Sequence, residues 1–182
     1  MAHFRRSTLV PLILAVLALV PAGEARRLHR VSRAFDAVGL CRQTHYAKLC
    51  QALAASTAVS SPQSLVEASV ERAALKAEHA QAVAAQLSAA PGAEKVLQNV
   101  LQSCRDSYGS AADALQKALQ LVRGGGRAAD INSELTAAGT FVDTCQDSFD
   151  EFPDVDGSLL TNVQTNLSRL VSNSLNLAAA LH

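Results

Sequence analysis

Apolar residues recur at steps of three and four along four long stretches of the chain, the spacing of one buried face on an α-helix. The stretches cover about 63–90, 93–123, 127–149 and 158–181. Alanine dominates the apolar positions of the first stretch, and leucine those of the last. The two central stretches carry their apolar stripes at Leu97, Val100, Cys104, Tyr108, Ala111, Leu115, Ala118 and Val122, then at Ile131, Leu135, Ala138, Val142, Cys145 and Phe149.

Short breaks rich in glycine and proline separate these stretches. Ser61 suits a helix N-cap and Pro62 the first helical position, and Ser158 or Asp156 is expected to cap the last helix. Four long helices joined by short loops pack as antiparallel neighbours. The fold class is therefore predicted to be all-α: an up-down-up-down four-helix bundle over 61–182, preceded by an N-terminal helical hairpin extension over 26–60. The breaks are Pro91-Gly92, Gly124-Gly125-Gly126 and the loop 151–157.

Two cysteines lie at nearly equal distances from the triple glycine. Cys104 comes 21 residues before Gly125, and Cys145 comes 20 residues after it. An antiparallel hairpin would place them side by side on the shared apolar seam, so a disulfide is expected. In the chain-entropy model this bond contributes about 4 kcal/mol. The alternative is two unpaired cysteines in the core, where free cysteine is common.

The other two cysteines, Cys41 and Cys50, are nine positions apart. Four cysteines allow three pairings, and the local pair leaves Cys104 for Cys145. Nine residues of one straight helix rise about 13 Å, too far for a disulfide, so the chain must turn near Thr44 and His45. His45 invites a zinc interpretation, but a structural zinc site needs four ligands and no second cysteine–histidine group lies nearby. No metal or cofactor is predicted.

Residues 1–25 resemble a secretory signal peptide. Arg5 and Arg6 precede an apolar run, and small residues follow, which predicts cleavage after Ala22 or Ala25. The rival interpretation is a membrane anchor, but the run is about 12 residues long where roughly 20 are needed to span a bilayer. The mature chain is expected to be secreted, without a membrane segment, into an oxidising compartment that permits two disulfides.

The remaining residues supply no catalytic constellation. Lysine plus arginine equal aspartate plus glutamate at 16 each and the charges are scattered, so nucleic-acid binding has no electrostatic support. Asp143, Asp147 and Asp150 share a helix face, which is read as a solvated acidic surface or as a contact patch for a basic partner. Asn166-Leu167-Ser168 is the one N-glycosylation sequon, which makes Asn166 a candidate modification site. An enzyme is not predicted.

Four segments in order resemble the plant invertase/pectin methylesterase inhibitor family. The first cysteine pair with its internal threonine and aromatic residue, the helix around Cys104, the segment around Cys145 and a closing serine–asparagine–leucine stretch carry the resemblance. They span nearly all of the mature chain. The segments are Cys41-Arg-Gln-Thr-His-Tyr-Ala-Lys-Leu-Cys50, Leu101-Gln-Ser-Cys104-Arg-Asp-Ser-Tyr108, Thr144-Cys145-Gln-Asp-Ser-Phe149 and Leu170-Val-Ser-Asn-Ser-Leu-Asn-Leu177.

The resemblance implies one secreted inhibitor domain over 26–182 that forms a 1:1 complex with a carbohydrate-active enzyme. Members are found in the cell wall (apoplast), which is preferred here, or in the vacuole. Those that act on pectin methylesterase use a face of the bundle to cover the pectin cleft. Those that act on acid invertase place the loop before the last helix against the active site, with the sequence Pro-Lys-Phe.

The corresponding loop here reads Glu151-Phe152-Pro153-Asp154, without the lysine. This departure and the Thr-x-Tyr inside the first cysteine pair favour pectin methylesterase as the target and leave acid invertase as the alternative. The four loop residues and helix 63–88 are the candidate partner contacts. Two other classes stay open: a helical ligand carrier, although lipid-transfer proteins hold eight cysteines in a shorter chain, and a signalling bundle with a receptor partner.

Overall fold

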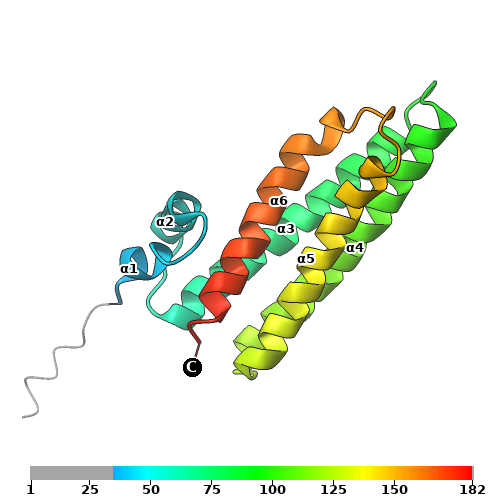
Figure 1. Cartoon of the computed structure of the whole chain (residues 1–182). Coiled ribbons are helices and arrows are strands. Elements are labelled where there is room, and N and C mark those ends of the chain that lie inside the picture. The colour runs from blue at the N-terminus through cyan, green and yellow to red at the C-terminus, as the bar shows by residue number, and fades with distance from the viewer. Residues whose placement is uncertain (1–34, 182) are drawn as a thin grey trace, which may run out of the picture. The chain divides into compact units, whose positions relative to one another are not determined.

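The computed structural model describes residues 35–181, and in this part of the chain every regular element is a helix (Figure 1). These described residues form one compact unit. The predicted signal segment lies outside the described residues. The helices are α1 (Ala37–Cys41), α2 (Ala47–Ser56), α3 (Pro62–Ser88), α4 (Lys95–Arg123), α5 (Ala128–Asp150) and α6 (Ser158–Ala178).

The four long helices follow one another as antiparallel neighbours, as Figure 1 shows. Helix α4 packs between α3 and α5, and α6 packs against both α5 and α3, which closes the bundle. The predicted up-down-up-down four-helix bundle and its preceding helical hairpin are confirmed. The short helices α1 and α2 pack against each other and against α3.

The bundle core is built from the predicted apolar stripes. Every stripe position of the two central stretches is buried except Leu97, which is half-buried. The alanines of α3 point into the core and, being small, let the neighbouring helices approach closely. Those fully buried alanines are Ala73, Ala77, Ala80 and Ala84.

Local sequence fixes where the helices begin and turn. The Ser61 hydroxyl accepts the Ser64 N–H at 3.1 Å, and the Ser64 hydroxyl accepts the Ser61 N–H at 3.0 Å, a reciprocal cap that starts α3 at Pro62 as predicted. Between α4 and α5, Gly125 adopts a φ of +68°, a left-handed conformation that favours glycine.

The start of α6 differs from the prediction. Gly157 is its N-cap, in place of Ser158 or Asp156. The Asp156 carboxylate still satisfies the helix end, because it accepts the Ser158 N–H at 2.8 Å and the Ser158 hydroxyl at 3.0 Å. An aspartate side chain readily accepts the N–H two residues on, so Asp156 caps from one position further out than an N-cap.

Hydrogen bonds between buried polar side chains connect the helices at defined positions along their axes. Ser69 of α3 and Ser174 of α6 share a hydrogen bond of 2.8 Å in the core. The Tyr108 hydroxyl donates to Gln164 Oε1, and the Gln164 Nε2 donates to the Val142 carbonyl at 2.8 Å, which links α4, α6 and α5. Burial raises the pKa of Tyr108, so the phenol stays protonated as the donor. Such bonds fix helix register because a shift would leave buried polar atoms unpaired.

The two predicted disulfides are present. Cys104 of α4 and Cys145 of α5 are both buried and bonded, with their Cα atoms 4.4 Å apart. Cys41 at the end of α1 is bonded to Cys50 in α2, with a Cα separation of 5.4 Å. No free cysteine occurs within residues 35–181, which hold all four cysteines. None of the helices described is long and apolar enough to cross a membrane.

Candidate functional site

The loop between α5 and α6 brings together the four residues predicted to contact a partner. Glu151, Phe152, Pro153 and Asp154 are all exposed, and Phe152 keeps 44% of its surface in contact with solvent. A large aromatic side chain at a loop tip has no role in the core. Its exposure makes it a natural anchor for a partner surface.

Hydrogen bonds and packing hold this loop in one conformation. The Phe152 N–H donates to the Phe149 carbonyl at 3.0 Å, and the Val155 N–H donates to the Phe152 carbonyl at 2.9 Å. Gly157 lies directly against the Phe149 ring, since an added Cβ there would be 3.2 Å from a ring carbon. Two successive turns and this close packing present Phe152 on an ordered backbone.

The surroundings of Phe152 are acidic. Asp150, Glu151, Asp154 and Asp156 are exposed, and none of them forms an ion pair with another residue in 35–181. On α5, partial burial and the neighbouring Asp147 charge raise the pKa of Asp143. The loop end of the bundle therefore offers an apolar tip among carboxylates and suits a partner with an apolar, basic surface.

We expect Asp156 to make the stability of the α6 start depend on pH. The Ser158 N–H and hydroxyl lower the pKa of Asp156, so its contribution exists above the unfolded pKa, about 3.9, and is lost as pH falls through the folded value. Asp156→Ala should lower the melting temperature at neutral pH but have little effect near pH ~2. Asp156→Asn is the control, because its amide oxygen can accept the same N–H without titrating. An equal effect of the alanine variant at both pH values would contradict this role.

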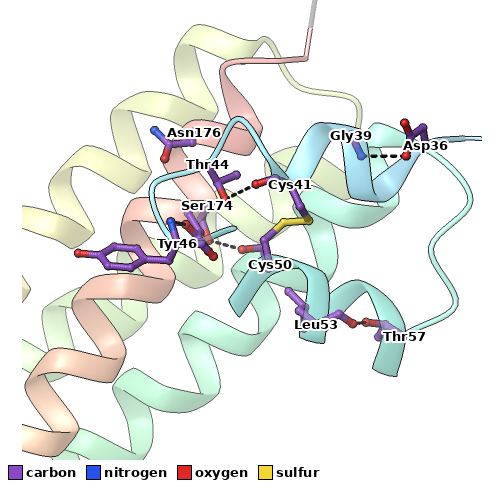
Figure 2. The surroundings of a disulfide bond; sticks show 12 residues. Asp36, Gly39, Cys41, Thr44, Tyr46, Cys50, Leu53, Thr57, Ser174 and Asn176 are labelled. Carbon is purple, nitrogen blue, oxygen red and sulfur yellow. Dashed lines mark hydrogen bonds between the residues drawn. A yellow bond between two sulfur atoms is a disulfide. The ribbon is translucent and has the colours of Figure 1, made fainter. Parts of the chain in front are cut away.

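The second region singled out by the sequence is the Cys41–Cys50 hairpin, shown in Figure 2. The chain turns between α1 and α2 at Arg42–Tyr46, where the sequence predicted it. The Thr44 hydroxyl donates to the Cys41 carbonyl at 2.8 Å, and Asp36 caps α1 by accepting the Gly39 N–H at 2.8 Å. The disulfide and these bonds make a small closed unit of the two helices.

Polar side chains of α6 hold this turn. The Asn173 carboxamide accepts the Tyr46 N–H and donates to the Tyr46 carbonyl, both at 3.0 Å, although only 2% of its surface is exposed. Asn176 Oδ1 accepts the His45 N–H at 3.0 Å. The serine–asparagine–leucine stretch of α6 thus has a structural role that the sequence analysis did not assign. Asn173 follows the buried Leu170 by three positions, and a polar residue at that spacing on the apolar face of α6 was the available signal.

Other candidate residues lie apart from these two regions. His45 Nδ1 shares a hydrogen bond of 3.0 Å with the Ser172 hydroxyl, and no group of three potential metal ligands occurs within residues 35–181. Asn166 is exposed on α6, as a modified asparagine must be. On the outer face of α3, Leu75 is 55% exposed, and this is the other predicted contact surface.

Comparison with known proteins agrees with this architecture. Residues 38–177 match the family described as plant invertase/pectin methylesterase inhibitor. The fold is similar to mutant form A of a pectin methylesterase inhibitor from Arabidopsis, with a TM-score of 0.69 and 21% identity over 81% of this chain and 99% of that one. A pectin methylesterase inhibitor from Arabidopsis thaliana gives 0.61 and 22% over 80% and 95%.

No curated protein matches the chain by sequence. The two solved structures, at these identities, establish the likeness of fold. The family match extends from the Cys41–Cys50 hairpin into the final turns of α6, and so includes both cysteine pairs, the exposed loop and the asparagines that hold the hairpin. The chain therefore belongs to the plant invertase/pectin methylesterase inhibitor family, a family of enzyme inhibitors.

Proposed function

We propose that this protein inhibits pectin methylesterase by forming a 1:1 complex that covers the substrate cleft. The family match over residues 38–177 carries the proposal, and the two similar structures are both titled as pectin methylesterase inhibitors. The exposed loop residues Glu151, Phe152, Pro153 and Asp154 are the proposed contacts. The mechanism is steric and needs no cofactor or catalytic group.

The rigidity of the bundle supports a blocking mechanism. Association loses free energy whenever flexible segments must become ordered. Here the presented loop is already fixed by backbone hydrogen bonds, and the Cys104–Cys145 bond ties α4 to the α5 helix that leads into it. Contact energy from Phe152 can therefore appear as affinity, as it does for preorganised aromatic anchors in other interfaces.

Sequence details favour pectin methylesterase over acid invertase. The loop lacks the lysine of the Pro-Lys-Phe pattern that the resemblance associates with invertase inhibitors, and its carboxylates give it the opposite charge. Acid invertase remains the second candidate target, because the matched family includes inhibitors of both enzymes.

The proposed site of action is the cell wall. Residues 1–25 would direct secretion and be removed, and residues 26–182 would act as one inhibitor domain: an extension over 26–60 and a bundle over 61–182. Both disulfides suit an oxidising compartment. In that setting Asn166 is a proposed glycosylation site, since its side chain is exposed.

The test is titration of a plant pectin methylesterase with the purified protein at mildly acidic pH, beside a parallel titration of an acid invertase. Pectin demethylation should fall in proportion to added protein and reach its minimum near one equivalent, while sucrose cleavage is unchanged. Reduced and alkylated protein, which has lost both disulfides, serves as the control. Full methylesterase activity with the protein in excess would refute the proposal, and loss of sucrose cleavage would favour the second target.

A further inference from the structure

Two hollows of about 280 and 400 Å³ adjoin beside α2, since Leu49 and Asn166 line both. The first lies between α2, α3 and α6, and the second between the start of α2 and α6. Leu53 and Leu170 add to the apolar floor of the first. We call the two hollows together the α2–α6 groove; it is distinct from the α5–α6 loop.

The groove is positively charged. Lys48, Arg72, Lys76 and Arg169 line it, and no aspartate or glutamate does. Within the described part of the chain none of these four cations pairs with a carboxylate. Outside the groove, three arginines are neutralised by carboxylates at 2.7–2.8 Å, namely Arg105 by Asp106, Arg123 by Glu67 and Arg127 by Asp130. The charge of the α2–α6 groove is therefore free to attract an anion.

The arrangement of these groups favours an anion with flat, apolar faces. Arg72 and Lys76 are four positions apart on α3, so their side chains leave the same face of the helix one turn apart. In the adjoining hollow, the Arg169 guanidinium lies 5.5 Å from the centre of the Tyr46 ring, which is 38% exposed. The floor offers leucine side chains and no free strand edge with which an extended peptide could pair.

A hexuronic acid residue has these properties. Its pyranose ring presents apolar C–H faces that can pack on leucine and tyrosine, and its carboxylate can pair with arginine or lysine. An acidic peptide would also satisfy the cations, but it lacks the apolar ring faces that can pack on the leucine floor and on Tyr46.

We propose that the α2–α6 groove binds an acidic saccharide chain composed of uronic acid residues. Such binding would hold the protein on a polyuronate independently of any enzyme contact, so this site does not rest on the proposed function. Asn166 borders both hollows, and a glycan attached there would occupy the mouth of the groove and compete with the saccharide.

The experiment measures binding of an unesterified oligogalacturonate by calorimetry at low ionic strength, with the fully methyl-esterified oligomer as the uncharged counterpart. The full chain is secreted into a bacterial periplasm, so that disulfides form and Asn166 stays bare. The acidic oligomer should bind and the ester should not. The double variant Arg72→Gln/Lys76→Gln should raise the dissociation constant about tenfold, the effect of removing two exposed ion pairs.

Lys95→Gln/Lys117→Gln is the matched control, because it removes the same charge from exposed α4 lysines that do not line the groove. It should change the dissociation constant less than about twofold. Unchanged melting temperatures show that both variants fold. Equal binding of the esterified oligomer, an equal effect of the control variant, or equally tight binding of poly-glutamate would each overturn the saccharide assignment. The last result would point to an acidic protein segment.

Discussion

Replacing Phe152 with alanine is expected to weaken inhibition of the target enzyme about 30-fold or more. Aromatic anchors at protein interfaces typically lose about 2 kcal/mol or more on truncation, which corresponds to that factor. Phe152 has 44% of its surface exposed and its backbone is fixed by two loop hydrogen bonds, so the free protein should be unaffected. The inhibition constant and the melting temperature of Phe152→Ala measure the two effects separately.

Leu75→Ala is the comparison for this prediction, because it tests the other predicted contact surface. Leu75 is also a large exposed apolar residue, at 55%, but lies on the outer face of α3. Its truncation should change the inhibition constant less than about threefold. The reverse result, with Leu75 sensitive and Phe152 tolerant, would place the enzyme contact on α3 and remove the loop from the proposal.

Loss of the Cys104–Cys145 bond should be the most damaging change to stability. The cysteines are 41 positions apart, and the chain-entropy model assigns a loop of this length about 4 kcal/mol. That is a large part of the 5–15 kcal/mol by which domains are typically stable. The double variant Cys104→Ala/Cys145→Ala, unfolded in urea, should show this loss as a lower midpoint.

The second disulfide provides the comparison. Cys41 and Cys50 are nine positions apart, so the same model predicts a loss of only about 2.5–3 kcal/mol for Cys41→Ala/Cys50→Ala. Both pairs are buried, which makes the two double variants similar in the number of side-chain atoms removed from the core. If removal of the shorter bridge were the more damaging, loop entropy would not be the dominant contribution of either bond.

The four-helix bundle was predictable because its determinants are local and periodic. Residues such as Leu115, Ala118 and Leu135 lie on stripes that any antiparallel pairing must bury, and all three are fully buried. The triple glycine predicted the turn, and the nearly equal distances of Cys104 and Cys145 from Gly125 predicted the register of α4 against α5. The helices, the turn and the cysteine pairing follow from the period of the apolar residues and from the number of residues between turn and cysteine, so a single sequence is enough to predict them.

The contacts that dock the hairpin have no such periodic signal. Asn173 meets Tyr46 across 127 positions, and neither residue carries a pattern that identifies the other. The α2–α6 groove was missed for the same reason. Its cations come from three separate helices, and along the sequence Lys48, Arg72 and Arg169 look like ordinary surface charges. Only the docking of α2 beside α3 and α6 brings them together.

The hydrogen bonds that Asn173 and Asn176 form with the turn at His45 and Tyr46 affect how this part of the protein unfolds locally. Local unfolding of the C-terminal half of α6 would break three of the hydrogen bonds that join the turn to that helix. Conversely, release of the turn would leave the buried Asn173 carboxamide, which is 2% exposed, without its hydrogen-bond partners. Two segments more than a hundred positions apart should therefore share one opening equilibrium, and hydrogen exchange should give the same opening free energy for the amides of both.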